Sequence, residues 1–294
     1  MPSERVALIG FGEVGQTLTA DLAGQTLAAF DCLFDRPGSW PHRRIAATGV
    51  RQATNHHDAV AGCYVIISAV TADQALAAAR SAAGGLHPGS WYLDVNSISP
   101  AARREIAAVV ESAGATYVEA AVMAPIQPAG IRSPMLLGGP GAEQFLPVGQ
   151  HLGFTGARFL TAELGKASAT KLCRSIVVKG LEALVSESLT AARFHGVDRH
   201  VLESLGNLLP AADWPEFARY LIGRSRRHGV RRAAELRHAA ATVAETGLEP
   251  VMSEAAARRQ QASAARRPDP PDAGLADLLD ALRPQPGSGK APAS

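Results

Sequence analysis

The chain has 294 residues, of which 47% are hydrophobic and 19% are charged, a composition typical of a globular protein. Its formal net charge of +2 gives no electrostatic reason to expect nucleic acid or an anionic membrane as a partner. No apolar run reaches the ~18 residues of a membrane span, and the N-terminus lacks the pattern of a signal peptide, so we expect a cytoplasmic protein. Cys32, Cys63 and Cys173 lack metal-site or disulfide spacing, which predicts reduced, buried thiols and no metal.

Strand and helix patterns alternate up to about residue 156. The strand patterns are RVALIG, LAAFDCLF, YVIISAV, SWYLDVN, YVEAAVM and PMLLGG. Helical patterns lie between them at Glu13–Leu22, Thr71–Ala83 and Pro100–Ala113. This alternation is typical of βαβ units, so we predict an α/β fold whose first domain, residues 1–164, is a doubly wound, mainly parallel sheet.

The second part of the chain has helical patterns only. We predict one long helix over Lys166–His195, ended by Gly196, and four more at Arg199–Leu209, Trp214–His228, Arg231–Glu245 and Pro250–Ala265. Residues 165–265 should therefore form an all-helical domain. The tail, residues 266–294, is rich in Pro, Gly and Ser and is predicted to be disordered, although ADLLDAL within it can form a short helix.

A glycine-rich loop follows the first strand. GFGEVG matches the G-x-G-x-x-G fingerprint of Rossmann dinucleotide-binding domains, in its expected place between a strand and a helix. In such a loop, Gly10 makes the tight turn, Gly12 lets a pyrophosphate approach the backbone, and Gly15 lets the helix pack closely. The predicted cofactor-binding residues of the loop are Gly10, Phe11, Gly12, Glu13, Val14 and Gly15. The alternative is a glycine-rich turn that binds nothing.

The fingerprint also needs an acid at the end of the second strand, about 20 residues on. We assign this role to Asp35, whose carboxylate would bind the adenosine ribose and favour NAD. The neighbouring Arg36 could instead attract the 2′-phosphate of NADP, so the preference for NAD is weak.

Two further strand ends should face the cofactor, because ligands bind beyond the carboxyl ends of parallel strands. Val70 and Thr71 follow YVIIS and leave room for it. Asn96 and Ser97 follow YLDV, where the nicotinamide is expected, and Asn96 can orient a carboxamide or a substrate hydroxyl. Alternatively, Asn96 and Ser97 only form a turn and cap the helix that begins near Pro100.

The long helix carries a polar stripe at spacings of three and four: Ser168, Lys171, Ser175, Lys179, Glu182, Ser186 and Arg193. It is either a solvated face, with Glu182 pairing with Lys179, or the lining of a cleft between the domains. In a cleft, Lys171 could polarise a carbonyl or, with its pKa lowered by burial, accept a hydroxyl proton. Ser175 could share the same substrate oxygen, and Arg174 and Lys179 could pair with an acidic substrate group.

These features together resemble the β-hydroxyacid dehydrogenase superfamily, which includes 3-hydroxyisobutyrate dehydrogenase and 6-phosphogluconate dehydrogenase. CRSIVVKGLEAL and HGVRRAAELRHAAATVAETGLEPVMSEA look like the branch with a DUF1932 C-terminal domain. The resemblance implies a Rossmann domain, a helical domain that forms a homodimer, and Lys171 as the catalytic lysine. It places substrate contacts at Met123 and Ala124, where apolar residues replace the family's polar S-G-G segment. The family usually has an Asn three or four residues after the lysine, and this chain has Arg174 and Ser175 there.

We therefore predict an NAD(P)-dependent oxidoreductase that moves a hydride between nicotinamide and a small hydroxy acid or related alcohol or carbonyl. Lys171, Ser175 and Asn96 are the predicted catalytic residues. An imine or aldehyde reductase of the same superfamily, or a catalytically silent protein that senses NAD(P), remains as an alternative.

Overall fold

The computed structural model describes residues 5–207, 213–264 and 273–282. The chain divides into two compact units, Met1–Leu172 and Cys173–Ser294, which we call unit one and unit two. The division falls within the long helix rather than before it, where the sequence analysis placed the domain boundary.

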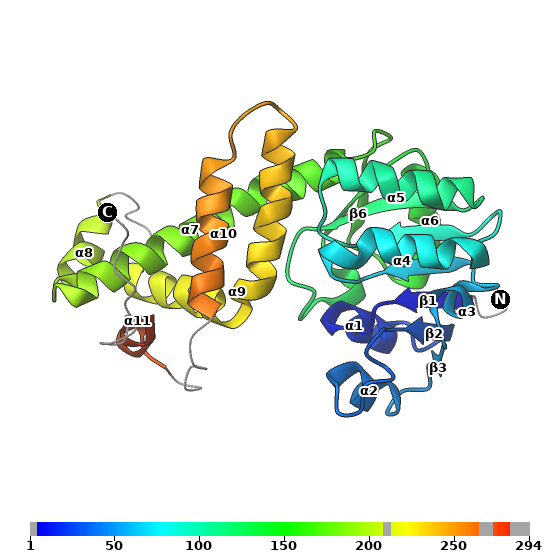
Figure 1. Cartoon of the computed structure of the whole chain (residues 1–294), viewed down its shortest axis with the longest axis horizontal. Coiled ribbons are helices and arrows are strands. Elements are labelled where there is room, and N and C mark those ends of the chain that lie inside the picture. Colours follow the sequence, from blue (N-terminus) through cyan, green and yellow to red (C-terminus); the bar gives the residue numbers. More distant parts are fainter. Residues whose placement is uncertain (1–4, 208–212, 265–272, 283–294) are drawn as a thin grey trace, which may run out of the picture. The chain divides into compact units, whose positions relative to one another are not determined.

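Unit one is built on an eight-stranded sheet with the order β3-β2-β1-β4-β5-β6-β7-β8 (Figure 1). Its strands are β1 (Arg5–Ile9), β2 (Thr26–Phe30), β3 (Arg51–Gln52), β4 (Val65–Ser68), β5 (Trp91–Asp94), β6 (Thr116–Val122), β7 (Met135–Gly138) and β8 (Ala157–Thr161). All neighbouring strands are parallel except β6 and β7. The strand order 3-2-1-4-5-6 is that of the Rossmann fold, which confirms the predicted fold class.

Helices cover both faces of this sheet: α1 (Glu13–Asp21), α2 (Trp40–Ile45), α3 (His56–Val60), α4 (Ala75–Ala82), α5 (Pro100–Ser112) and α6 (Ala142–Leu152), with 3₁₀ turns η1 (Ala72–Gln74), η2 (Ala83–Gly85) and η3 (Gly130–Arg132). On one face, Leu18 of α1 and Phe145 of α6 belong to the same buried cluster. On the other face, α3, α4 and α5 pack with Ile66 and Tyr92 of the sheet. Each central strand is thus buried on both sides, as parallel strands normally are.

The second strand is shorter than the pattern LAAFDCLF predicts. β2 ends at Phe30, because the Oδ1 atom of Asp31 accepts a hydrogen bond from the N–H of Leu33 at 2.9 Å. This local turn, in which an aspartate bonds the backbone two residues on, competes with continuation of the strand. The predicted strand end at Asp35 is therefore wrong by several residues.

Unit two is helical throughout its described residues, as predicted. It contains most of α7 (Lys166–Phe194), followed by α8 (Asp198–Leu205), α9 (Trp214–Ala244), α10 (Val251–Ala264) and α11 (Leu275–Leu282). The predicted break before Arg231 is absent, and α9 is a single helix. Gly229 lies inside it, where a Cβ atom would be only 2.3 Å from the carbonyl oxygen of Gln260 on α10, so this glycine permits close helix packing rather than ending a helix.

The short helix that ADLLDAL allows within the tail is present as α11, and its Leu279 is fully buried in a cluster that also contains Leu221 of α9. The remainder of that tail, residues 266–272 and 283–294, lies outside the described residues, as do Leu209 and Ala265. No helix in the described part of the chain is long and apolar enough to cross a membrane.

The prediction of buried thiols holds for one cysteine only. Cys63 is buried, whereas Cys32 and Cys173 are exposed. Cys32 lies in the turn that ends β2, and Cys173 lies on α7 beside the exposed Arg174.

Candidate functional site

The glycine-rich loop lies at the carboxyl end of β1 and leads directly into α1. Gly10 has φ +94°, and a Cβ atom on it would lie 2.4 Å from the carbonyl oxygen of Ala69. A Cβ atom on Gly15 would lie 2.2 Å from the carbonyl oxygen of Gly10. Neither position accepts a side chain, so both glycines shape the loop itself.

Gly12 differs, because no heavy atom of the described residues lies within 4 Å of the place a Cβ atom would take. It is also the N-cap of α1, and as a glycine it offers no side chain to the first N–H groups of that helix. Such N–H groups, with the positive end of the helix dipole, bind phosphates. Open space and unused donors therefore fit a pyrophosphate at this loop.

The acid at the carboxyl end of β2 is Asp31 rather than Asp35. Its Oδ2 atom accepts a hydrogen bond from the N–H of Phe11 in the glycine-rich loop at 2.8 Å, across a separation of 20 residues. Asp35 and Arg36 lie further along, in an exposed turn. The expected spacing could have identified Asp31, but the continuous apolar pattern of LAAFDCLF concealed the end of the strand.

Asn96 joins the carboxyl ends of β4 and β5. Its Oδ1 atom accepts a hydrogen bond from the N–H of Val70 at 2.8 Å, and its Nδ2 atom donates one to Oγ of Ser68 at 3.0 Å. The residue is 3% exposed, so its amide is used to hold the two strand ends. A direct contact of Asn96 with cofactor or substrate stays a prediction.

The other predicted residues at these ends are more accessible. Thr71 is exposed, and Val70 and Ser97 are half-buried. Neither Asn96 nor Ser97 caps α5, because Ser99 is its N-cap and accepts a hydrogen bond from the N–H of Ala102 at 3.3 Å. The helix-capping alternative is therefore wrong, and Ser97 is left available at this edge.

A row of polar side chains crosses the sheet just below this edge. Ser68 of β4 pairs with Asp94 of β5, and Asp94 pairs with Glu119 of β6. All three are fully buried. Two buried carboxylates require compensating charges or hydrogen bonds, since burying an unpaired charge is costly.

Arg103 of α5 supplies much of this compensation and is itself fully buried. Its Nη1 atom lies 3.0 Å from Oδ1 of Asp94 and 2.7 Å from the Asp94 carbonyl oxygen. The same nitrogen donates to the hydroxyl of Tyr117 at 3.3 Å, and that hydroxyl donates to Oδ2 of Asp94 at 2.8 Å. Burial alone would lower the pKa of Arg103, but the neighbouring Asp94 carboxylate raises it above its usual value, so the guanidinium stays charged.

Arg103 also reaches two other segments. Its Nη2 atom donates to the carbonyl oxygen of Asn96, and its Nε atom donates to Oγ of Ser168, in the first turn of α7, at 2.8 Å. One planar guanidinium therefore connects the loop after β5 to the start of the long helix.

Glu119 caps the N-terminus of α7. Its carboxylate accepts hydrogen bonds from the N–H of Gly165, at 2.6 Å, and from the N–H of Ser168. Gly165 has φ +95°, and a Cβ atom on it would lie 2.9 Å from Cβ of Pro100, so this position excludes a capping side chain of its own. A carboxylate at a helix N-terminus is favoured by the helix dipole. Sequence reasoning missed Glu119, Arg103 and Ser168 as a set because Ser168 lies 49 residues from Glu119 and 65 residues from Arg103.

Lys171 follows Ser168 by three residues on α7 and is half-buried. The chain has only four lysines, and three of them, Lys166, Lys171 and Lys179, lie in this helix. Elsewhere its cations are almost all arginines, which do not lose their proton in proteins, whereas lysine can. Ser175, the other predicted catalytic residue of α7, is buried, and Arg174 is exposed.

The polar stripe of α7 is not a solvated face, because Ser168, Ser175, Lys179, Glu182 and Ser186 are all buried. In unit two, the Nζ atom of Lys179 lies 2.7 Å from Oε2 of Glu235 on α9. Burial lowers the pKa of Lys179 even though Glu235 opposes the shift. The ammonium is thus already paired within unit two, which does not support the predicted substrate contact of Lys179.

Glu182 is likewise paired with α9 and α10 rather than with Lys179. The Oε1 atom of Glu182 accepts a hydrogen bond from Nη1 of Arg232 at 2.7 Å, and its Oε2 atom accepts one from Nε2 of Gln260 at 2.9 Å. The prediction that Glu182 is the partner of Lys179 is therefore wrong. Arg232 of α9 is itself 3% exposed, so this ion pair is buried.

The predicted substrate contacts, Met123 and Ala124, come directly after β6. Met123 is half-buried, its N–H donating to the carbonyl oxygen of Pro134 at 2.9 Å, and Ala124 is exposed. Because β6 is parallel to β5, both residues lie at the same edge of the sheet as Asn96. The described residues contain no group of three or more His, Cys, Asp or Glu side chains that could hold a metal.

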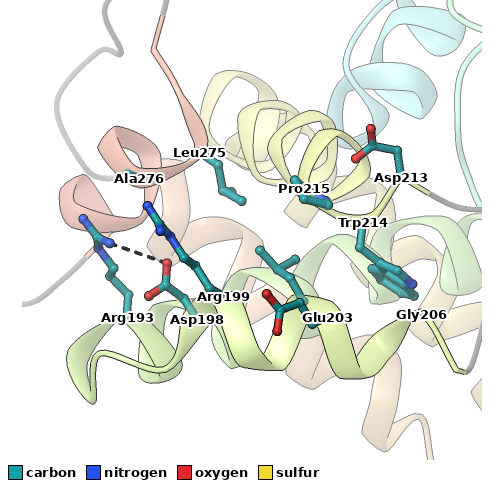
Figure 2. A pocket seen from close by; sticks show the side chains of 11 residues that line it. Arg193, Asp198, Arg199, Glu203, Gly206, Asp213, Trp214, Pro215, Leu275 and Ala276 are labelled. Atoms are coloured by element: carbon teal, nitrogen blue, oxygen red, sulfur yellow. Dashed lines mark hydrogen bonds and ion pairs between the residues drawn. The ribbon is translucent and has the colours of Figure 1, made fainter.

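Unit two contains a cavity of about 580 Å³ lined by residues of α7, α8, α9 and α11. Figure 2 shows Arg193 and Asp198 at one side of it, joined by an ion pair of 3.5 Å, and Trp214 at the other. None of the predicted site residues lines this cavity, and we assign it no function.

The solved structures that are similar to this chain include the following three. A conserved hypothetical protein from Sinorhizobium meliloti 1021 is 31% identical, with 95% of each chain covered and a TM-score of 0.73. A conserved protein of unknown function, described as structurally similar to 3-hydroxyacid dehydrogenases, is 34% identical, with 87% of this chain and 95% of its own covered and a TM-score of 0.67. The 3-hydroxyisobutyrate dehydrogenase of Mycobacterium tuberculosis shares the fold, at 21% identity over 96% of this chain and 100% of its own, with a TM-score of 0.70.

Two family models also match. The model for the NAD binding domain of 6-phosphogluconate dehydrogenase matches residues 5–157. The model for the domain of unknown function DUF1932 matches residues 192–263. The chain therefore belongs to the family that carries the 6-phosphogluconate dehydrogenase type of NAD-binding domain, within the NAD-binding dehydrogenase and reductase superfamily, and bears a C-terminal DUF1932 domain.

Proposed function

We propose that this protein is an NAD(P)-dependent oxidoreductase that acts on the CH–OH group of a small hydroxy acid or related alcohol, or on the corresponding carbonyl, with Lys171 as general acid and base. The observation that carries the proposal is the attachment of α7. The turn that precedes Lys171 is bonded, through Arg103, to the loop after β5. In a sheet of this order, that loop is where the nicotinamide is expected.

The residues of this chain would divide the work as follows. The N–H groups that begin α1 bind the pyrophosphate beside Gly12, and Asp31 accepts hydrogen bonds from the adenosine ribose. A bound nicotinamide would supply the hydride chemistry. In oxidation, Nζ of neutral Lys171 takes the proton of the substrate hydroxyl; in reduction, the Lys171 ammonium donates a proton to the carbonyl oxygen.

We propose NAD rather than NADP as the preferred cofactor. A carboxylate at the end of β2 accepts hydrogen bonds from both ribose hydroxyls and repels a 2′-phosphate. Asp31 stands at that position and already bonds the glycine-rich loop. Arg36 lies in the exposed turn beyond it, so its attraction for a 2′-phosphate is screened by solvent.

The test is absorbance of reduced nicotinamide with purified protein, NAD or NADP, and a panel of hydroxy acids and related alcohols. Lys171→Met should still bind NADH but lose about 100-fold or more in turnover, the usual contribution of a general acid or base. Lys166→Met is the matched control, because Lys166 lies on the same helix with its side chain 61% exposed, and it should turn over like the wild type.

Other outcomes lead to other assignments. Turnover of Lys171→Met at the wild-type rate would remove this lysine from the mechanism. Reduction only of a carbonyl offered together with an amine would indicate an imine reductase. NADH binding without turnover on any panel member would favour a sensor of NAD(P).

We further propose that unit two forms a homodimer interface. Val177, Leu184 and Phe194 of α7 are 64%, 56% and 67% exposed, and exposed apolar residues of this size mark interaction surfaces when they gather. Light scattering after size-exclusion chromatography should give twice the mass of one chain. A monomeric mass at micromolar concentration would contradict this part of the proposal.

A further inference from the structure

Arg103 is fully buried and uses its N–H donors on separate partners within the fold. Its charge is already balanced by Asp94 at 3.0 Å. Its two other nitrogens bond segments from different parts of the fold. Nη2 donates to the carbonyl oxygen of Asn96, after β5, and Nε donates to the hydroxyl of Ser168, on α7. The guanidinium is planar and rigid, and its donors point in fixed directions, so it sets the distance between these two segments.

The start of α7 is also held by the packing of Ala167 and Leu172, which are 0% and 1% exposed, and by Glu119. Glu119 bonds two of the N–H groups there, which fixes the height of the first turn above β6. Backbone nitrogens lie close to the helix axis, inside the ~2.3 Å radius of the Cα atoms, so bonds to them restrain rotation about that axis less than a bond to a side-chain oxygen further out. The side-chain bond from Arg103 to Ser168 restrains the rotation, and Lys171, three residues later, projects from the same face.

We propose that Arg103 is a positioning residue for the reaction: with Ser168 it sets the rotation of α7, and so the direction of Lys171, relative to the loop that receives the nicotinamide. The inference rests on the proposed function of Lys171. An error of about 1 Å in the position of a catalytic group can cost about 100-fold in rate, so one hydrogen bond at this place has consequences for turnover.

The decisive variant is Ser168→Ala, which removes the bond to α7 and leaves the ion pair of Arg103 with Asp94. Its matched control is Tyr117→Phe, which removes one hydroxyl from the same guanidinium, at 3.3 Å, without touching α7. Ser168→Thr keeps the hydroxyl and serves as the conservative rescue. Thermal unfolding of all three, without cofactor, shows that each folds.

We expect Ser168→Ala to lose about 10- to 100-fold in kcat, with its KM and its Kd for NADH within about twofold of wild type. Tyr117→Phe and Ser168→Thr should stay within about threefold in kcat. Equal losses in Ser168→Ala and Tyr117→Phe would overturn the proposal, because the effect would then come from the buried network in general.

A second readout does not depend on turnover. The reaction of Lys171 with trinitrobenzenesulfonate can be followed by peptide mass spectrometry as a function of pH, with Lys166 as an internal reference. Ser168→Ala should shift the profile of Lys171 and leave that of Lys166 unchanged; an unshifted Lys171 profile would overturn the proposal. A shifted profile in a protein that turns over no substrate would support the positioning by Arg103 while contradicting the proposed function.

Discussion

Replacing Gly12 with alanine should weaken cofactor binding without harming the fold. No atom of the described chain lies within 4 Å of the added Cβ, and the backbone, at φ −76° and ψ −160°, suits any residue. Alanine stabilises the fold by reducing the entropy of the unfolded chain, and it destabilises the fold because it is a poorer N-cap than glycine. The two effects roughly cancel, so the free energy of unfolding should stay within about 1 kcal/mol of wild type. In the complex the methyl group takes space needed by the pyrophosphate. Overpacking by one methyl costs about 1–3 kcal/mol, which raises the Kd of NADH about 5- to 150-fold.

The assay is a fluorescence titration with NADH beside thermal unfolding of the protein alone. Gly24→Ala is the control for adding a methyl group where there is open space away from the loop, because no described heavy atom lies within 4 Å of its added Cβ either. Gly24 lies before β2, at the opposite edge of the sheet. Gly15→Ala is the control for a filled site, because its Cβ would lie 2.2 Å from a backbone oxygen; it should lower stability and binding together. Unchanged NADH affinity in Gly12→Ala would refute a pyrophosphate at this loop.

Three further predictions follow from individual contacts. Asp31→Asn should raise the Kd of NADH about tenfold or more and leave NADPH binding nearly unchanged, because hydrogen bonds to a charged group are worth about 1.5–3 kcal/mol. If Asp35→Asn has an equal effect in the same titration, binding of the adenosine ribose would be assigned to Asp35 instead. Arg232→Met removes the ion pair of 2.5 Å between Arg232 and the buried carboxylate of Glu182. The free energy of unfolding, measured in urea, should fall by about 3–5 kcal/mol. A fall below about 1 kcal/mol would show that the other partners of Glu182 are sufficient to stabilise its charge. Burial lowers the pKa of His56 below 6.5 in the folded protein. Between that lowered pKa and 6.5 the unfolded chain binds more protons than the folded one, so the free energy of unfolding should rise with pH. His56→Gln should flatten this dependence of stability on pH, measured by thermal unfolding, and an unaltered dependence would assign it to another group.

The sheet could be predicted from sequence wherever its strands are buried. Apart from Ser68, Asp94 and Glu119, the central strands are mostly apolar on both faces, because helices cover both faces of a parallel sheet. Such strands form short hydrophobic runs in the sequence. β3 has only two residues, both exposed, and β8 is mostly exposed. Neither carries the pattern, and both were missed.

The acid of the fingerprint shows a different limit. Asp31 ends β2 by bonding the N–H of Leu33, an interaction that depends on one side chain rather than on periodicity. The hydrophobic pattern continues through Leu33 and Phe34, so the sequence predicts a longer strand, with Asp35 rather than Asp31 at its end. The glycines of the loop were placed correctly because their spacing is set locally by the turn itself.

The polar stripe of α7 could be recognised from its spacing, but its surroundings could not, because the partners lie far away in sequence. Ser168 meets Arg103 across 65 residues and Glu182 meets Arg232 across 50. A lysine whose pKa is lowered by burial, such as Lys179, is usually a candidate for function, yet here its ammonium lies 2.7 Å from Glu235 within unit two. The lowered pKa of Lys179 therefore does not by itself mark that residue as catalytic. For the role that we propose for Lys171, position in the fold is the better guide. Lys171 follows the first turn of α7, which Arg103 and Glu119 bond to the loop after β5 and to β6.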